Sequence, residues 1–443
     1  MTLPVFQSTS HETHTPNNLR GGGPNMSLPN LRSVAQGLQA PTNDRDDSIR
    51  SGVTRQTLTP HVPPRAVAYQ RTGYALGLFG VIWHITGLWL LLRTGLSTRL
   101  RTAAYRFSRR PIPRIDGTPP FLALTVYFLG FSLLIVIWSL PLSLAGLGLE
   151  SHYGFSRQTA AGYLSDVGIG FLFNCTVIPV LWCAYRLRAA SPRHWWVWLW
   201  AILAPLLFVQ MVLQPLVIAP AYNRFTPLPD GALRARILAL AERAGIRGGR
   251  VLVADTSRRT RHVNAFVTGW GPTTRIVIED TALKELPEDQ ILAMVGHEMG
   301  HYVEGHVWIL FVSSAVGAGF LLWILARMIP WLLHRFGSRY GLTGLTDLAA
   351  LPLILLALYI LLQLQMPAAN AESRLLEHRA DTYGLRLTHL NAAMADLFVG
   401  FAERDYADPD PPALFQWWYG SHPSLSSRIE YARHYRTVAG SSD

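Results

Sequence analysis

The sequence is short of charge, of lysine and of cysteine. Charged residues make up only 15% of its 443 residues, against roughly 25% in soluble proteins, which excludes a disordered or fibrous chain and argues against an ordinary soluble enzyme. Lysine occurs once, as Lys284, so arginine supplies the net charge of +11. That bias indicates a G+C-rich, bacterial genome. The two cysteines, Cys175 and Cys183, lie in one apolar run and cannot bridge within a helix, so no disulfide framework is expected.

Long apolar runs dominate what is present. A basic chain can bind nucleic acid, but here the arginines lie between apolar runs, a pattern typical of membrane proteins. A lipid bilayer, and no nucleic acid, is therefore the expected partner. Six runs can cross a hydrocarbon core of ~30 Å at ~1.5 Å per residue. None of them contains Asp, Glu, Lys or Arg, whereas buried helices of a large soluble protein would carry charged residues on one face. They cover residues 73–92, 120–149, 167–185, 195–219, 307–326 and 348–366.

Two stretches are polar enough to lie outside the membrane, residues 222–304 and 368–443. The first begins with a predicted helix over Pro229–Ala244. Strand patterns follow at Val251–Ala254, Val263–Thr268 and Arg275–Glu279, the last two joined by a turn at Gly269–Pro272. A helix then begins at Pro287, with acidic residues in its first turn, where they suit the helix dipole. The second stretch is predicted to be mostly helical.

The helix from Pro287 contains an HExxH motif, His297-Glu298-Met299-Gly300-His301. Imidazoles four residues apart lie on one helix face, so both can reach one Zn²⁺ at ~2.0–2.1 Å. Glu298 is then placed to take a proton from the attacking water. With 15 histidines in the chain, chance placement yields roughly 0.01 such matches. The motif therefore predicts a zinc site with His297 and His301 as ligands.

Zinc needs a third protein ligand. Glu304 lies about 10 Å along the helix axis from His297, too far to share the ion. A better candidate follows the last apolar run, where Glu377 and Asp381 are four residues apart on one helix face. We expect Glu377 to bind the metal and Asp381 to accept an imidazole N–H beside it. His378 points about 100° away on that helix and is not an expected ligand.

HExxH with a distant ExxxD resembles the glutamate-zincins, and the wider pattern resembles the type I CAAX prenyl endopeptidase family of integral-membrane zinc proteases. The similarity covers residues 120–435. It rests on Tyr153-Gly154-Phe155-Ser156, Asn223-Arg224-Phe225-Thr226-Pro227-Leu228-Pro229, Asn264-Ala265-Phe266, Arg275-Ile276-Val277-Ile278, Asp280-Thr281, Ser373-Arg374 and His422-Pro423.

The resemblance implies further roles for residues outside the zinc motif. Asn264 and Ala265 resemble the family's edge strand that pairs with the substrate backbone. His422 is similar to a histidine that steadies the tetrahedral oxyanion, although its sequence context alone indicates a loop residue before a helix near Ser424. Asp381 would orient a zinc-bound histidine and, in some accounts, donate a proton. Family members usually have seven spanning helices around an intramembrane chamber, whereas six runs are present here.

The expected fold class is therefore an α-helical polytopic membrane protein with a zincin-like α+β protease domain built from the two polar stretches. The expected organisation is a disordered tail (1–70), four spans (71–220), the first part of the protease domain (221–306), two further spans (307–367) and the second part (368–443). The expected reaction is hydrolysis of peptide bonds in membrane-associated, lipidated or misfolded proteins, with one Zn²⁺ per chain.

Two alternatives remain open at this point. One is an intramembrane site-2-type metalloprotease, which would carry HExxH inside a spanning helix. The other is a transporter or scaffold with a vestigial zinc site, whose spans should carry paired charges or broken helices; here they carry only His84 and Asn174. Loop arginines alone place the polar stretches outside the cytoplasm, whereas the resemblance implies a bacterial cytoplasmic membrane with the site facing the cytoplasm, which is the expectation adopted.

Overall fold

The computed structural model describes residues 60–112, 117–269 and 273–436. Within them six helical segments are long and apolar enough to cross a membrane, as the six apolar runs predict. They are α1 (Pro64–Arg93), α3 (Phe121–His152), α4 (Ala160–Asn174) continued by α5 (Val177–Ala190), α6 (Trp195–Leu213) continued by a π-helical turn (Gln214–Ile218) and α7 (Ala219–Tyr222), α11 (His306–Tyr340), and α12 (Leu351–Thr388) preceded by a 3₁₀ turn (Leu348–Ala350). A shorter helix, α2 (Leu96–Phe107), packs against α3.

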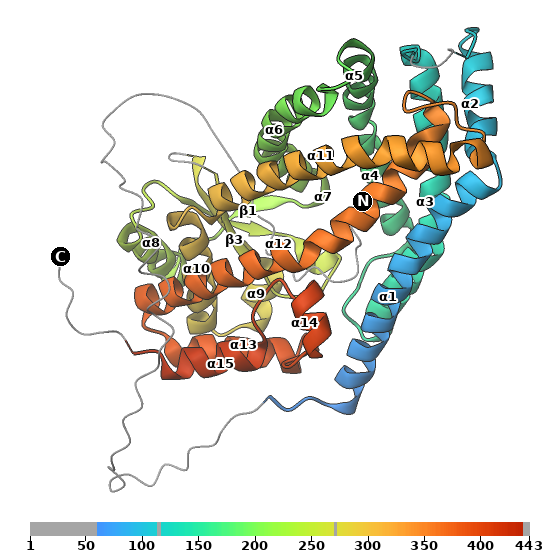
Figure 1. Ribbon diagram of the computed structural model, residues 1–443. Coiled ribbons are helices and arrows are strands. Elements are labelled where there is room, and N and C mark those ends of the chain that lie inside the picture. Colours follow the sequence, from blue (N-terminus) through green and yellow to red (C-terminus); the bar gives the residue numbers. More distant parts are fainter. Residues whose placement is uncertain (1–59, 113–116, 270–272, 437–443) are drawn as a thin grey trace, which may run out of the picture.

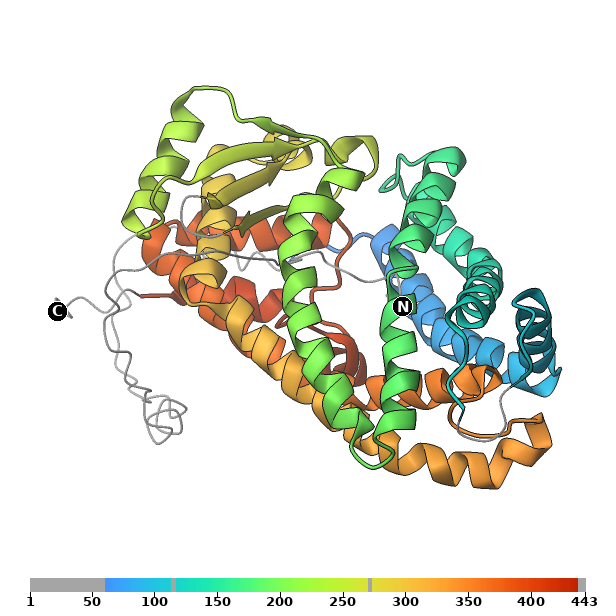
Figure 2. The ribbon, with the colours of Figure 1, turned by 90° about the horizontal axis from the view of Figure 1, so that it is seen from above.

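The spanning helices α1 and α3 lie on one side of the molecule and the sheet on the other, and α6, α11 and α12 run between the two sides (Figures 1 and 2). Figure 1 shows α11 and α12 running side by side from the sheet toward α2 and α3. Seen from above, α1 to α3 (blue to teal) and the sheet lie on opposite sides of the molecule (Figure 2). Helices α11 and α12 therefore connect the membrane part to the part that carries the sheet.

The sheet has four strands in the order β1-β2-β4-β3. Their bounds are β1 (Phe225–Pro227), β2 (Arg250–Ala254), β3 (Ala265–Thr268) and β4 (Arg275–Glu279). Strands β2 and β4 are parallel, and β3 pairs with β4 antiparallel. The predicted hairpin is thus present, while residues 270–272 of its predicted turn lie outside the described residues. Strand β1, which pairs antiparallel with β2, was not predicted.

The core of this part forms where α8 (Ala232–Arg243) and α10 (Glu288–Val303) pack against the sheet. Ile276 and Ile278 of β4 are fully buried on the face that packs against these helices, and Val277, which points to the opposite face, is buried too. The two isoleucines contact buried Leu292 and Met299 of α10 and Ile237 of α8. The short helix α9 (Asp280–Glu285) joins β4 to α10. This core fixes the position of the HExxH helix.

The second polar stretch adds three helices, α13 (Asn391–Glu403), α14 (Ala413–Tyr419) and α15 (Leu425–His434). Buried Met394 and Phe398 of α13 pack with Ile429 of α15 and with Leu385 near the end of α12. The helix expected near Ser424 is therefore α15, and the Ser424 side chain accepts a hydrogen bond from the Ser427 backbone N–H at its start.

Three expected boundaries differ from the structure. Residues 64–70, assigned to the disordered tail, form the first turns of α1, because Pro64 suits a helix start and Tyr69 is buried against the rest of the chain. The boundary expected at residue 367 falls inside α12, which continues unbroken to Thr388. One helix thus crosses the membrane and carries the predicted third ligand. The predicted helix over Pro229–Ala244 is α8, which begins three residues later, at Ala232.

Candidate metal centre

Helix α10 brings the two histidines of the HExxH motif together. His297 and His301 lie one turn apart, and their Nε2 atoms are 3.1 Å from each other. The turn before them, Ala293 to Val295, is buried, so the motif is shielded from solvent. His297 itself is 7% exposed.

Helix α12 brings a carboxylate to the same point. Glu377 Oε2 lies 3.4 Å from His297 Nε2, and Glu377 Oε1 lies 3.4 Å from His301 Nε2. This approach depends on glycine, because a Cβ added at Gly384 would lie 2.9 Å from the backbone nitrogen of His297. Gly300 similarly faces the backbone of α12. The two helices therefore pack closely enough for all three side chains to converge.

The three residues have the chemistry of a metal site. Two imidazole nitrogens and a carboxylate oxygen are a common zinc donor set. An ion held tetrahedrally at ~2.0–2.1 Å separates its ligand atoms by about 3.3–3.4 Å. The two Nε2 atoms are 3.1 Å apart, and each lies 3.4 Å from one of the two carboxylate oxygens of Glu377. Glu377 Oε2 is buried and has no hydrogen-bond partner among the described residues. The residues therefore fit a divalent cation, and among the described residues they are the only such group of three.

Asp381, one turn beyond Glu377, contacts the first histidine from behind. Its Oδ1 lies 2.9 Å from His297 Nδ1, so the Nε2 lone pair of that ring faces Glu377. Burial acts to lower the pKa of His297, but the neighbouring carboxylates of Asp381 and Glu377 outweigh it and raise the pKa to about 10. The surroundings of this imidazole therefore stabilise positive charge, as a cation site requires.

Arg428 of α15 also belongs to this site, although it was not among the residues predicted from the sequence. Its Nε and Nη2 donate to the two carboxylate oxygens of Asp381, at 2.8 and 2.7 Å, and its guanidinium lies 4.2 Å from the centre of the Phe398 ring. Nη2 is also 3.6 Å from Glu377. One signal could have found it: two carboxylates expected to be buried beside a metal need a cation nearby, and α15 carries this one.

His422 lies at the same carboxylate. Its Nε2 is 3.3 Å from Glu377 Oε1, and its Nδ1 is 2.8 Å from the Ser421 hydroxyl. Burial lowers the pKa of His422 to about 4, so the ring is neutral at pH 7. Its loop is held against α12 by the Arg374 guanidinium, which donates to the Gln416 and Gly420 carbonyl oxygens at 3.2 and 2.6 Å.

Glu298 is the remaining polar residue of the HExxH motif. Its Oε1 lies 4.0 Å from His297 Nε2, and its side chain is 11% exposed. Burial raises the pKa of this carboxyl, and the neighbouring histidines act in the opposite direction. Glu298 thus lies beside the three-residue group without belonging to it.

Asn264 and Ala265 lie at the start of β3, the edge strand of the sheet, near the motif helix. Ala265 is the first residue of β3, and β3 packs against α10. Strand β3 pairs with β4 on one side, and no described strand pairs with its other side. The Asn264 backbone carbonyl accepts from Glu279 N–H at 3.0 Å, and its side chain accepts from Ala265 N–H at 2.9 Å. The start of the edge strand is therefore held in place.

The residues that the sequence analysis set aside lie away from the three-residue group. Glu304 accepts a hydrogen bond from Arg379 Nε at 2.7 Å. The His378 ring packs 4.5 Å from that of Tyr431. In the spans, Asn174 donates to Ser132 at 3.1 Å, and His84 Nδ1 lies 2.7 Å from the Gly80 carbonyl oxygen. The two polar groups in the spans are thus hydrogen-bonded to neighbouring helix residues.

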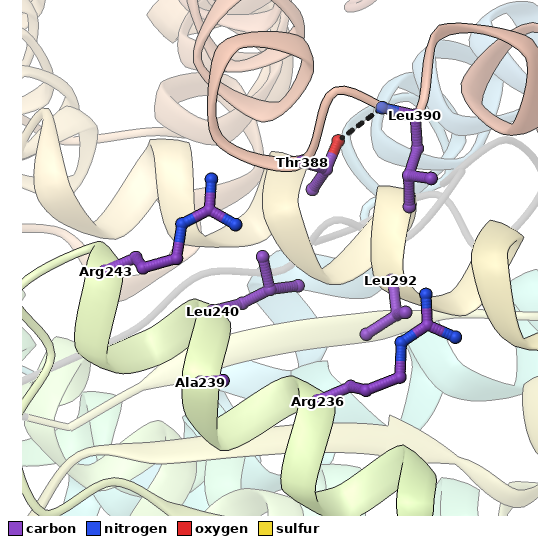
Figure 3. Close-up of a pocket in the computed structure, with 7 residues that line it drawn as sticks. All are labelled: Arg236, Ala239, Leu240, Arg243, Leu292, Thr388 and Leu390. Atoms are coloured by element: carbon purple, nitrogen blue, oxygen red, sulfur yellow. Dashed lines mark hydrogen bonds between the residues drawn. The ribbon is translucent and has the colours of Figure 1, made fainter.

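A separate hollow of about 210 Å³ lies between α8, α10 and the end of α12 (Figure 3). It shares no residue with the metal-site candidates. It is lined by Arg236, Ala239, Leu240, Arg243, Leu292, Thr388 and Leu390. Both of its arginines have partners, because Arg236 pairs with Glu288 and Asp289 and Arg243 donates to the Leu387 carbonyl oxygen.

Two family models match this chain, one over its first four spans and one over most of the chain that follows them. The model of "Peptidase family M48" matches residues 227–436, and that of "CAAX prenyl protease N-terminal, five membrane helices" matches residues 52–224. Four of the six candidate spans lie in the second range.

Individual relatives agree with these matches. The chain is 36% identical to the "uncharacterized metalloprotease YhfN" of Bacillus subtilis, over 72% of this chain and 75% of the relative. It is 30% identical to an Arabidopsis thaliana CAAX prenyl protease 1 homolog, over 73% and 77%. The solved structure of S. mikatae Ste24p shares the fold, with a TM-score of 0.69 at 21% identity, over 83% of this chain and 87% of that one. The chain therefore belongs to peptidase family M48, as an integral-membrane metalloendopeptidase of the CAAX prenyl protease type.

Proposed function

We propose that the protein is a zinc endopeptidase whose ion is held by His297, His301 and Glu377. Membership of family M48 implies a metal, typically zinc. The observation that carries the proposal is the convergence of two imidazole nitrogens and a carboxylate at distances of 3.1–3.4 Å. One ion per chain follows from one such site.

The chain's own residues divide the work of hydrolysis. When bound, zinc acts as a Lewis acid toward the scissile carbonyl and the attacking water. Glu298 accepts the proton of that water and returns it to the leaving amine. Asp381, held by Arg428, fixes the ring of His297. The neutral His422 donates a hydrogen bond to the developing oxyanion, a contribution of about 3–4 kcal/mol in other hydrolases.

The edge strand supports a binding mode for the substrate. An extended peptide can add to an open strand edge through backbone hydrogen bonds, and β3 offers such an edge beside α10. Asn264 and Ala265 begin that edge, so we assign them to substrate binding. Backbone pairing accepts many side chains, which suits membrane-associated, lipidated or misfolded proteins as substrates. Several relatives are named as CAAX prenyl proteases, and cleavage of prenylated C-termini falls within this class.

The alternatives of the sequence analysis find less support. A site-2-type protease would carry HExxH in a spanning helix, whereas α10 is not among the candidate spans and packs against the sheet. A transporter would carry charged groups at mid-membrane depth, whereas the six apolar runs contain no Asp, Glu, Lys or Arg.

Substitution of Glu298 tests the proposal. Glu298→Gln keeps the size of the side chain and removes the base, so zinc binding should persist while turnover falls by about 10²–10⁴-fold. Glu288→Gln on the same helix is the matched control, because Glu288 pairs with Arg236 at the surface. The assay is cleavage of an unfolded membrane protein by the solubilised chain, with and without a chelator. Wild-type cleavage by Glu298→Gln would refute the role of Glu298.

The same variant identifies the substrate and the membrane side. Proteins that co-purify with Glu298→Gln but not with wild type in the host membrane should be substrates. We place the protein in a bacterial cytoplasmic membrane with the site facing the cytoplasm, because the resemblance implies that side. Protease protection of a C-terminal tag in inside-out and right-side-out vesicles tests this placement, and a tag accessible from the periplasmic side contradicts it.

A further inference from the structure

A series of contacting polar side chains extends from His301, starting at the ring nitrogen that does not face Glu377. While His301 Nε2 faces Glu377, its other ring nitrogen, Nδ1, lies 2.9 Å from His306 Nδ1. His306 Nε2 lies 3.2 Å from Glu304 Oε2, which accepts from Arg379 Nε at 2.7 Å. The order is thus His301, His306, Glu304 and Arg379.

The turn between α10 and α11 places His306 there. Helix α10 ends at Val303, and Gly305 adopts a left-handed conformation with φ of +65°. That conformation suits glycine, and it lets α11 begin at His306 with the side chain folded back over the last turn of α10. His306 is 1% exposed although it is polar, so its hydrogen bonds must be made within the protein.

The ring protons of His301 and His306 can be assigned in one consistent way. Two ring nitrogens at 2.9 Å share one proton. If His301 binds a metal through Nε2, its proton is on Nδ1 and is donated to His306 Nδ1. The proton of His306 is then on Nε2 and is donated to Glu304. Every donor has an acceptor with both rings neutral.

We propose that His306 is a positioning residue that fixes the tautomer and orientation of His301, with Glu304 and Arg379 holding His306 in turn. The inference rests on the proposed metal site. Each imidazole ligand then has its own partner at the ring nitrogen that does not bind the metal. The Asp381 carboxylate contacts His297 directly, whereas His306 lies between His301 and the Glu304 carboxylate.

Zinc affinity tests the proposal without an activity assay. The full chain in detergent is stripped of metal, and its zinc Kd is measured by competition with a chromogenic chelator. His306→Leu fills the space but accepts no hydrogen bond, and should raise the Kd by about 10–100-fold. His306→Asn should bind zinc nearly as wild type does, because its amide oxygen can replace Nδ1 as acceptor. Tyr302→Phe is the control: Tyr302 lies next to His301 but bonds to Thr274, so its Kd should not change.

The outcomes separate this inference from the proposed function. Wild-type affinity in His306→Leu, or affinity in His306→Asn as weak as in His306→Leu, overturns the positioning role. If His306→Leu does not fold, Glu304→Leu, which removes the acceptor for His306 Nε2, decides: a raised Kd supports this series of contacts, and an unchanged Kd overturns it. If the wild-type chain binds no zinc, or if His301→Ala binds it as tightly as wild type, the metal site itself is wrong.

Discussion

Replacement of Asp381 by asparagine removes one negative charge from a buried network. Asp381 is 1% exposed and Arg428 is 7% exposed, and two hydrogen bonds of 2.8 and 2.7 Å join them. Asparagine leaves the guanidinium with one hydrogen-bond acceptor at this position, and the nearest remaining negative charge is Glu377, 3.6 Å from Nη2. Breaking a buried pair by removing one partner costs ~3–5 kcal/mol. Because a loss of 1 kcal/mol lowers the melting temperature of a domain of roughly 150–250 residues by ~2–4 °C, the zinc-free variant should melt about 6–20 °C below the zinc-free wild-type protein.

The same substitution should weaken zinc binding, because His297 loses the carboxylate that orients its ring. Removal of such a partner costs about 10–100-fold in metal affinity. The assays are thermal unfolding of the stripped protein and zinc competition, with Asp396→Asn at an exposed position of α13 as the control.

A double variant distinguishes charge imbalance from lost packing. Arg428→Met removes the unpaired cation and keeps contact with Phe398, so Asp381→Asn with Arg428→Met should recover most of the lost stability. The reasoning is refuted if Asp381→Asn melts as wild type does, or if the double variant loses the sum of the two single losses.

Two further predictions concern packing and pH. Gly384→Ala should lower both the melting temperature and the zinc affinity, because the added methyl would lie 2.9 Å from the backbone of the motif helix, whereas Gly168→Ala, with no atom within 4 Å, should change neither. Burial acts to lower the pKa of His262, but hydrogen bonds to Asp405 and Glu150 outweigh it and raise the pKa to about 9. This contribution to stability is complete below pH ~6.5 and is lost as the pH rises to about 9. The melting temperature should fall over that range and fall less in His262→Gln; equal slopes would contradict the assignment.

Local patterns predicted the spans, the hairpin and the HExxH helix because each depends on short-range spacing. Hydropathy did not reveal the length of α12. The polar residues after 366, such as Glu372 and Arg374, end the apolar run, but they are good helix formers and do not end the helix. Hydropathy indicates whether a segment lies in lipid or in water, whereas the length of a helix depends on the helix propensity of its residues.

Contacts between distant segments could not be predicted from spacing. Arg428 is 47 residues from Asp381, and only the packing of α15 on α12 joins them. The start of α1 shows the same limit. Its composition resembles that of the polar tail, yet Gln70 donates to the Tyr406 carbonyl oxygen at 3.0 Å and Tyr69 donates to Glu150 at 2.5 Å. Those partners lie far along the chain, so the sequence near residue 64 carries no sign of them.

The most direct test of the metal site is X-ray absorption at the zinc edge of the solubilised, zinc-loaded chain. The account predicts one ion per chain with two imidazoles and oxygen donors at ~2.0–2.2 Å, and loss of most bound zinc in Glu377→Gln. A spectrum with one imidazole or none, or full zinc occupancy in Glu377→Gln, would contradict it.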